Sequence, residues 1–387
     1  MGTYGRYDLA MESGSGRVCK GEDGRSFIDF GSGIGVNSFG YCDGEWADAV
    51  SAQAHKLQHC SNYYYTKVQA ELAEMLCSAA GYAKVFFGNS GAEANECAIK
   101  IARKYSFDKY GKGRSKILTL KNSFHGRTVC TLSATGQDIM HQYFFPFVPD
   151  FDYVEAGNTA ELEEKLDSTV CAVMLEFIQG EGGVVPLKKE FVKEVFKLCA
   201  AKDVLVIADE VQTGVGRTGK LLCAEHYGVR ADITTLAKGL GGGLPIGVCL
   251  AKDRCAEVLT KGTHGSTFGG NPVVCAGALS ILSRVREPVF LDEVARKGRY
   301  MKVKLEQMKG IKQINGKGLM IGAVLDDRLK AADIAKACYE NGLLILTAKT
   351  NLRFLPPLNI SFGEIESGLE ILAAVLERAS SPVSDVI

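Results

Sequence analysis

The chain has 387 residues, 46% hydrophobic and 23% charged, a composition that excludes wholesale disorder and is typical of a globular protein with a sizeable core. Its 45 Lys and Arg residues balance 45 Asp and Glu residues, so no general positive field exists to attract nucleic acid or an anionic membrane. No apolar run reaches the ~18–20 residues that span a bilayer, and the N-terminus lacks the apolar core of a signal peptide. We therefore expect neither a nucleic-acid partner nor a membrane.

Two residue types stand out. The 44 glycines make up about 11% of the chain, against a typical ~7%. The 13 cysteines are scattered from Cys19 to Cys338 without a C-x-x-C pair, unlike a disulfide scaffold or a zinc ribbon. This pattern predicts a reducing, cytoplasmic environment in which most thiols are small buried residues. His55, His59 and Cys60 have no further ligand cluster, so we expect no metal site.

In chain order, residues 18–20 and 26–30 flank a turn at 21–24, and this pattern predicts a hairpin. From about residue 45, helical stretches alternate with short apolar runs, which favours a mainly parallel sheet covered by helices on both faces. The expected helices are 46–57, 69–79 and 92–105, and the expected strands are 85–87, 117–120, 173–178, 204–208, 233–237 and 247–250.

After about residue 275 the pattern changes to a long helical region, a strand at 318–324, a helix at 331–341 and a strand at 353–355. These elements indicate a separate α+β unit. No Pro-, Ser- or Gly-rich linker is present, so the glycines are expected in loops that follow strands. Ligands bind at such loops in open α/β sheets, beyond the carboxyl ends of the strands.

Residues 214–220 (GVGRTGK) match two nucleotide-binding patterns in their letters but not in their context. The dinucleotide fingerprint lies directly in the turn between a strand and a helix, whereas residues 209–213 intervene here. A P-loop needs Ser or Thr after its lysine, and Leu221 stands there. An NAD enzyme or an NTPase is therefore disfavoured.

Two polar residues, Asp209 and Lys238, directly follow the apolar runs 204–208 and 233–237. A buried Asp209 would need a cationic or hydrogen-bonding partner, although capping a helix is a common role for such an aspartate. Lys238 precedes a glycine loop, where partial desolvation lowers the pKa of a lysine and favours Schiff-base chemistry. A surface lysine is the ordinary alternative.

Three other segments contain groups suited to binding a ligand. Ser90 opens a helix whose free N–H groups form a phosphate cradle or merely a capped helix end. Phe124 provides a ring suited to stacking, and Arg127 provides a guanidinium suited to binding a carboxylate. The ordinary alternative is a core phenylalanine and a surface arginine. Ser266 and Thr267 are hydroxyls in a glycine-rich loop. A lysine, a strand-end carboxylate, a phosphate cradle and a stacking ring together are the parts that a pyridoxal 5′-phosphate site requires.

Seven segments together resemble the class III (subgroup II) aminotransferases over nearly the whole chain. The family implies a fold-type I homodimer with its active site at the subunit interface. Its large domain, here residues 45–275, has a mainly parallel sheet, and its smaller α+β domain is built from both termini, here 1–44 and 276–387. The segments are 86–96 (FFGNSGAEANE), 124–128 (FHGRT), 179–183 (QGEGG), 209–219 (DEVQTGVGRTG), 237–239 (AKG), 264–272 (HGSTFGGNP) and 353–358 (RFLPPL).

The resemblance assigns the cofactor-binding residues by motif. Lys238 is similar to the lysine that bonds the aldehyde of pyridoxal phosphate and then shuttles the proton, and Asp209 to the partner of the pyridine nitrogen. The other implied contacts are Phe124 and Val211 on the two ring faces, Gln212 near the ring hydroxyl, Ser90, Gly91 and Ala92 at the phosphate, and Thr267 from the neighbouring subunit.

The resemblance also assigns the substrate-binding residues. Arg127 is similar to the residue that binds the carboxylate remote from the reacting amine, with Ser266 close by. Arg353 resembles the clamp for the α-carboxylate of glutamate or 2-oxoglutarate, and Glu181 resembles the residue that pairs with Arg353 when the other donor is bound. Gly33 aligns where ornithine aminotransferases have a tyrosine, so it leaves room for an acyl group.

Within the family, the segments most resemble enzymes that transfer the terminal amino group of N2-acetyl-L-ornithine to 2-oxoglutarate in arginine biosynthesis. Transfer from succinyl-diaminopimelate, succinylornithine, ornithine or GABA is an alternative, as is an isomerase similar to glutamate-1-semialdehyde aminomutase. The chain departs from the family pattern at Phe177, Asn315 and residues 41–44, which bear on pocket shape and N-terminal packing.

Overall fold

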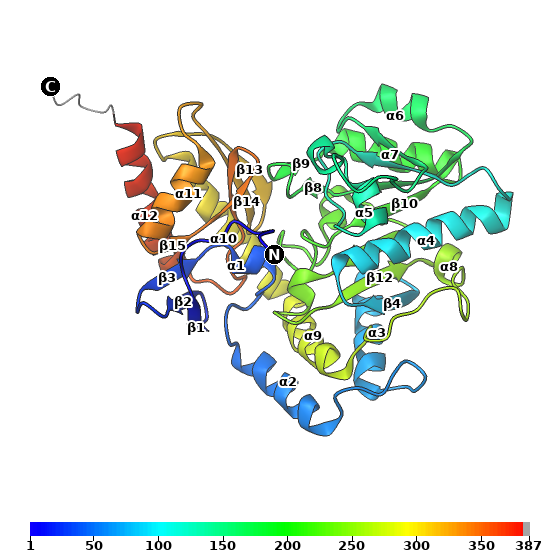
Figure 1. The fold of residues 1–387 in the computed structure, drawn as a ribbon, viewed down its shortest axis with the longest axis horizontal. Helices are drawn as coiled ribbons and strands as arrows, with labels where there is room; N and C mark the ends of the chain where they lie inside the picture. The colour runs from blue at the N-terminus through cyan, green and yellow to red at the C-terminus, as the bar shows by residue number, and fades with distance from the viewer. Residues whose placement is uncertain (382–387) are drawn as a thin grey trace.

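A computed structural model describes residues 1–381 of the chain, and its centre is a seven-stranded sheet (Figure 1). The strand order is β4-β12-β11-β10-β7-β5-β6. β12 runs antiparallel to its neighbours β4 and β11, and the other neighbours pair in parallel, which confirms the mainly parallel sheet. The strands are β4 (Lys84–Gly88), β5 (Lys116–Leu120), β6 (Phe151–Val154), β7 (Val170–Leu175), β10 (Leu205–Asp209), β11 (Ile233–Leu236) and β12 (Gly247–Ala251).

Helices cover both faces of this sheet, which is why its central strands are apolar along their whole length. In β10, Leu205 and Ile207 pack in one core cluster with residues of α4, whereas Val206 and Ala208 pack in another with residues of α7. Alternate side chains therefore face opposite layers. The surrounding helices are α3 (Lys67–Ala80), α4 (Gly91–Tyr110), α5 (Val129–Ala134), α6 (Thr159–Lys165), α7 (Lys189–Ala201), α8 (Asp253–Ala256) and the short 3-10 helices η1 (Asp138–Met140), η2 (Cys223–Tyr227) and η3 (Lys238–Leu240).

Two smaller sheets lie beside the large one, and the first of them contains strands from both ends of the chain. The order β1-β2-β3-β15 joins N-terminal strands to a C-terminal one, and the antiparallel β2–β3 pair confirms the predicted hairpin. In Figure 1 the blue N-terminal strands lie beside the orange and red C-terminal helices. These strands are β1 (Met11–Ser15), β2 (Val18–Gly21), β3 (Ser26–Asp29) and β15 (Leu343–Leu344), and the helices are α10 (Pro288–Glu306), α11 (Ala331–Glu340) and α12 (Phe362–Ser380).

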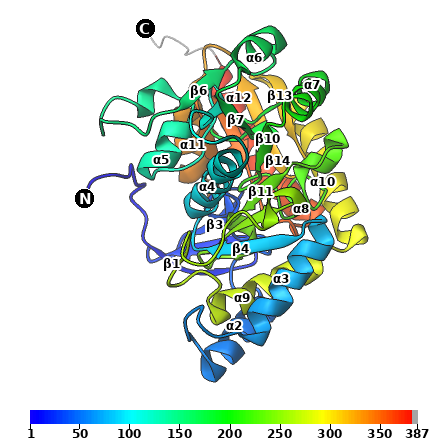
Figure 2. The ribbon, with the colours of Figure 1, turned by 90° about the vertical axis from the view of Figure 1, so that its right-hand side faces the viewer.

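The second small sheet has the order β13-β14-β17-β16 and is antiparallel throughout. Helix α9 packs against both α2 and α3, and α3 packs against β4, the edge strand of the large sheet (Figure 2). The remaining elements are β13 (Ile311–Lys317), β14 (Met320–Leu325), β16 (Leu346–Ala348), β17 (Asn351–Phe354), the two-stranded pair β8 (Ile178–Gln179) and β9 (Val185–Pro186), α1 (Ser32–Gly35), α2 (Gly44–Lys56) and α9 (Pro272–Val285).

The structure differs from the sequence prediction at several places, among them β6 and α7, which match no predicted element. The helical region after residue 275 is two helices, because Pro288 cannot continue α9 and instead starts α10. The strand expected at 173–178 ends at Leu175, where Glu176 leaves the ladder. Strand β13 and helix α12 were not anticipated, although α12 begins with a capping box formed by Ser361 and Glu364. Within residues 1–381 no helix has the length and apolar character needed to cross a membrane.

The sheet brings three polar residues to one edge. Asp209 ends β10 opposite Thr235 of β11, and η3 starts at Lys238 just beyond β11. On the other side, β7 pairs in parallel with β10 up to Leu175, so Glu176 follows at the same edge. This is the carboxyl edge of the parallel strands, where α/β proteins bind their ligands.

Candidate active site

A pocket of about 450 Å³ lies at this carboxyl edge. It is formed by the start of α4, the loop after β5, the segments after β7 and β10, and the loop that begins at η3. Nine of the residues predicted from the sequence line it: Ser90, Gly91, Ala92, Phe124, Arg127, Asp209, Val211, Gln212 and Lys238.

Asp209 is 4% exposed and its carboxylate is held by hydrogen bonds from three directions. Oδ2 lies 2.8 Å from His125 Nδ1 and accepts from Asn95 Nδ2 at 2.8 Å, and Oδ1 accepts from Val211 N at 3.0 Å. Thr235 donates to Asn95 Oδ1 at 2.7 Å, which turns the amide nitrogen toward the carboxylate. Burial alone would penalise this carboxylate, and these contacts offset that penalty.

Glu176 is a second carboxyl group of the pocket and is 5% exposed. It accepts hydrogen bonds from Phe124 N at 3.0 Å and Gly180 N at 3.4 Å, so it holds the loop of the stacking ring and the loop that precedes Glu181. Burial raises the pKa of Glu176 to about 7, and the neighbouring Asp209 carboxylate adds to the increase.

Lys238 faces the pocket from the start of η3. Desolvation lowers the pKa of its ammonium group, while the carboxylates of Glu181 and Asp209 oppose this effect. Its backbone φ of 41° lies in the left-handed region that non-glycine residues seldom occupy. Such conformations are concentrated at functional sites, where the surrounding structure imposes them.

The first turn of α4 forms the wall of the pocket opposite Lys238. Ser90 caps the helix by accepting from Glu93 N at 3.2 Å, while the N–H groups of Gly91 and Ala92 precede the intrahelical ladder. A Cβ on Gly91 would lie 2.7 Å from Val211 Cγ1, so glycine allows the helix to approach the segment after β10. Free amides at a helix N-terminus are suited to bind an anion.

Arg353 and Glu181 form an ion pair next to the pocket. Arg353, on β17, is 3% exposed, and its Nη1 lies 2.5 Å from Glu181 Oε1. The same nitrogen is 3.4 Å from Oε1 of Gln212, which lines the pocket. The structure therefore brings together a pair whose members are 172 residues apart in the sequence.

The remaining predicted residues lie outside this pocket. Ser266 accepts from Asn89 Nδ2 at 3.1 Å, which puts its hydroxyl against the pocket wall. Thr267 lines a separate narrow crevice beside the start of α3. Gly33 has a φ of 61°, and a Cβ there would find its nearest neighbour 3.8 Å away, so backbone conformation rather than space disfavours a side chain.

Sequence reasoning missed Asn95, His125 and Glu176 as site residues. His125 lies in the 124–128 segment, where the resemblance assigned roles to Phe124 and Arg127 only. Glu176 stands at the end of an apolar run, so the argument that singled out Asp209 applied to it equally. Asn95 gives no such signal, because only the fold brings it to Asp209.

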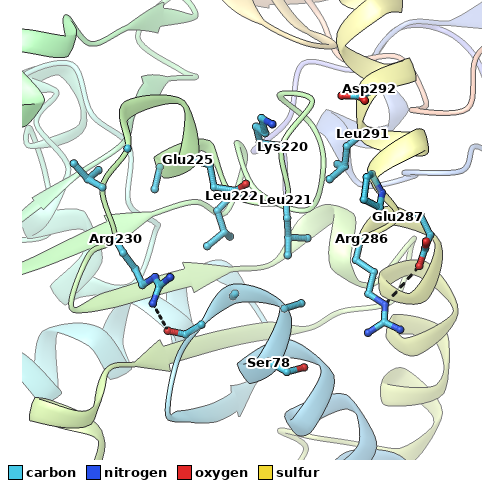
Figure 3. A pocket seen from close by; sticks show the side chains of 17 residues that line it. Ser78, Lys220, Leu221, Leu222, Glu225, Arg230, Arg286, Glu287, Leu291 and Asp292 are labelled. Carbon is cyan, nitrogen blue, oxygen red and sulfur yellow. Dashed lines mark hydrogen bonds and ion pairs between the residues drawn. The ribbon is translucent and has the colours of Figure 1, made fainter.

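A cavity larger than this pocket lies elsewhere. It measures about 990 Å³ and lies between α3, the 220–230 segment and α10 (Figure 3). Leu221, Leu222 and Leu291 point into it, and its rim carries charges of both signs. It contains none of the predicted site residues. Chemistry rather than size therefore identifies the active site.

The departures from the family pattern also lie away from the active-site lining. Phe177 is fully buried and stacks on Tyr227 with ring centroids 5.1 Å apart. Asn315 is on β13, where its Oδ1 accepts from Gln313. Within residues 1–381 no group of three or more His, Cys, Asp or Glu side chains could hold a metal ion.

Comparison with known sequences identifies the class of protein. The pattern of the family described as aminotransferase class-III matches residues 3–376, and the chain belongs to this family. It is therefore an aminotransferase, and the family in general depends on pyridoxal phosphate.

Individual relatives narrow the likeness further. The chain is 50% identical to acetylornithine aminotransferase of Haemophilus ducreyi, over 97% of this chain and 96% of that protein. It is 44% identical to acetylornithine aminotransferase of Methanocaldococcus jannaschii, over 96% and 94%. Among solved structures, N-acetylornithine aminotransferase from Stenotrophomonas maltophilia K279a has a TM-score of 0.85 at 36% identity, covering 96% of each chain. Ornithine aminotransferase from Toxoplasma gondii ME49 has a TM-score of 0.93 at 32% identity, covering 98% of this chain and 92% of that one.

The raised pKa of Glu176 predicts a pH dependence of stability. An ordinary glutamate ionises near 4.5, whereas folded Glu176 keeps its proton up to about 7. Between these values the folded state binds more protons, so the free energy of unfolding falls as the pH rises. We expect Glu176→Gln to make this fall shallower in urea unfolding measured from about pH 5 to about pH 7.5.

Glu210, whose pKa burial also raises to about 7, and Asp29, whose pKa burial raises as well, contribute to the part of the fall that remains. The exposed Glu164→Gln is the matched control and should keep the wild-type slope. A wild-type slope in Glu176→Gln would contradict the prediction.

Proposed function

We propose that this aminotransferase transfers the terminal amino group of N2-acetyl-L-ornithine to 2-oxoglutarate, with pyridoxal 5′-phosphate as cofactor, in arginine biosynthesis. The observation that carries the proposal is the Arg353–Glu181 pair beside the pocket of Lys238 and Asp209. An arginine that has its own carboxylate partner suits an enzyme whose two substrates differ in charge next to the reacting carbon. The identity of the donor comes from relatives named as acetylornithine aminotransferases, to which the chain is 41–50% identical.

The pocket residues fit pyridoxal phosphate. When bound, the cofactor supplies an aldehyde that takes up amino groups and a ring that disperses negative charge. We assign its phosphate to the start of α4, because the amides of Gly91 and Ala92 and the hydroxyl of Ser90 form an anion cradle there. The Cβ-free Gly91 supports the assignment, since a side chain would collide with Val211.

Asp209 is assigned to the ring nitrogen, where a buried carboxylate keeps a proton in place. His125 and Asn95 hold that carboxylate in its orientation. We assign Phe124 and Val211 to the two faces of the ring and Gln212 to its hydroxyl. Glu176 fixes the backbone of Phe124, so it supports the stacking face without touching the ring.

Lys238 is assigned as the residue that bonds the cofactor and moves the proton at the reacting carbon of the substrate. Desolvation lowers the pKa of its amine, which favours the neutral form that can accept a proton at Nζ. The nearby carboxylates of Glu181 and Asp209 limit this lowering of the pKa.

The substrate carboxylates are assigned to two arginines. Arg127, whose Cζ lies 5.5 Å from the Phe124 ring centroid, would bind the carboxylate remote from the reacting amine, with Ser266 nearby. Arg353 would bind the α-carboxylate of 2-oxoglutarate or glutamate. Acetylornithine reacts at its terminal amine and brings no carboxylate there, so Glu181 neutralises Arg353 instead. Gly33 leaves room for the acetyl group.

We further propose a homodimer in which Thr267 reaches the partner's phosphate site. Thr267 does not line the pocket of its own chain, and the adjacent Phe268 is 62% exposed. Tyr63 and Tyr65, 93% and 101% exposed, add to an aromatic surface of the kind that interfaces bury. All thirteen cysteines are free, which supports a cytoplasmic location.

The cofactor assignment predicts a visible absorption band that depends on Lys238. Purified protein should absorb as pyridoxal phosphate bound covalently to a lysine does, and Lys238→Ala should lose this band on dialysis because the covalent link is gone. Lys220→Ala, which changes an exposed lysine, should keep the band. A band that survives dialysis of Lys238→Ala would contradict the assignment.

The donor is tested by comparing kcat/KM for acetylornithine, ornithine, succinyl-diaminopimelate and GABA, each with 2-oxoglutarate. We expect acetylornithine to give the highest value, because Gly33 accommodates an acylated amine. A higher value for another donor would replace the proposed substrate. Turnover of an amino substrate without 2-oxoglutarate would indicate an isomerase instead.

The pairing of Glu181 with Arg353 predicts unequal effects on the two half-reactions. Glu181→Ala should impair amino transfer from acetylornithine at least ~10-fold more than transfer from glutamate, because only the first leaves Arg353 without an anion. Glu181→Gln keeps a hydrogen-bond acceptor but loses the charge. Its rate of amino transfer from acetylornithine should therefore lie between those of the wild type and Glu181→Ala. Single-turnover rates for each donor measure this, and equal losses would contradict the prediction.

A further inference from the structure

The 214–219 segment, which resembles nucleotide-binding motifs only in its letters, contains a deeply buried arginine. Arg217 is 2% exposed, and no carboxylate among residues 1–381 lies within 4.0 Å of its guanidinium. A buried cation without a carboxylate partner is costly, because nothing compensates fully for its lost hydration. Burial accordingly lowers the pKa of Arg217 to about 9. The contacts that offset this cost must therefore come from groups other than carboxylates.

Arg217 is bound by backbone carbonyls instead of a carboxylate. Its Nη1 donates to two backbone carbonyls, Leu319 O at 3.1 Å and Pro356 O at 2.5 Å. Its own carbonyl accepts from Leu319 N at 3.0 Å. Nη2 has no partner in the described part of the chain. One guanidinium nitrogen therefore bridges the turn before β14 and the segment after β17.

The backbone around Arg217 is forced into close contact with that turn. A Cβ on Gly318 would collide with the carbonyl carbon of Thr218, so only glycine permits the approach. Val215 has a φ of 54°, in the left-handed region that is unfavourable for a β-branched residue. The strain is tolerated because the neighbouring contacts hold the segment in place.

The two bridged segments carry groups of the active site. Pro356 lies three residues after Arg353, on the same extended segment that β17 begins. Arg217 lies five residues after Gln212, whose Oε1 is 3.4 Å from Arg353 Nη1. The 209–219 segment thus contacts the Arg353 strand twice, through Gln212 on the pocket side and through Arg217 behind it.

We propose that Arg217 is a positioning residue for the carboxylate site: by tying the segment after β17 to the 209–219 segment, it sets the position of the Arg353 guanidinium relative to the pocket. A displaced Arg353 would bind the carboxylate next to the reacting carbon less well. The inference rests on the proposed function in one respect, the assignment of Arg353 to that carboxylate.

The test compares KM with kcat for glutamate in the cofactor-loaded enzyme. Arg217→Met keeps the buried volume but removes the charge and both hydrogen bonds, so KM should rise at least ~10-fold while kcat stays within ~3-fold. Arg217→Lys keeps the charge and the N–H donors on a compact head group that fits the two carbonyls less well than a guanidinium, so it should show a smaller rise. Lys220→Met, which changes an exposed cation just beyond the same segment, should keep the wild-type KM. A fall in kcat with unchanged KM would overturn the proposal.

A double-mutant cycle separates positioning from general damage, because residues that act through one another are not additive. In the Arg353→Ala background, Arg217→Met should raise the KM for glutamate no further. The same rise in both backgrounds would overturn the proposal, since Arg217 would then act elsewhere. If Arg217→Met fails to fold, Arg217→Lys replaces it in the cycle, and a wild-type KM in that variant overturns the proposal.

The same measurements distinguish failure of the inference from failure of the proposed function. No turnover of acetylornithine refutes the donor but leaves the glutamate KM as a test of Arg217. A wild-type KM in Arg353→Ala refutes the carboxylate assignment and, with it, this inference. A raised KM in Arg353→Ala together with a wild-type KM in Arg217→Met refutes the inference alone.

Discussion

The buried carboxylate of Asp209 is the group on which the rest of the site depends. At 4% exposure it is stable only while Asn95, His125 and the Val211 amide supply hydrogen bonds. These donors come from α4, the loop after β5 and the segment after β10. One charge therefore fixes three segments relative to one another. The proposed phosphate cradle, stacking ring and second ring face lie on those same segments.

The glycine content of the chain has a related cause. Backbone segments meet at this edge too closely for side chains. A Cβ added to Gly91 would lie 2.7 Å from Val211 Cγ1, and a Cβ added to Gly239 would lie 2.7 Å from the hydroxyl oxygen of Ser38. A Cβ on Gly247 would collide with the Ser90 carbonyl, so the proposed phosphate cradle itself needs a glycine on the adjoining strand. Close packing of main chain around the pocket accounts for these glycines better than flexibility does.

Charge is used locally in this molecule, in accord with its formal net charge of zero. Arg353 has a single carboxylate partner, Arg127 is exposed beside an aromatic ring, and Arg217 is bound only by carbonyls. Each arginine thus has a different environment and a different proposed task. Anions would be bound by placed side chains, because the chain has no general positive field to attract them.

The sequence by itself determined the features that depend on local pattern. Apolar runs predicted the strands of the large sheet except β6, because a strand covered on both faces must be apolar throughout, and their ends located Asp209 and Lys238. The roles of Arg353 and Glu181 came from motif resemblance. Only the tertiary structure decided that Glu176 holds the Phe124 loop, that Asn95 and His125 hold Asp209, and that Arg217 bridges two distant segments. The physical reason is that periodicity reports how deeply a residue is buried, whereas its hydrogen-bond partners, in this site up to 172 residues away, are chosen by chain topology.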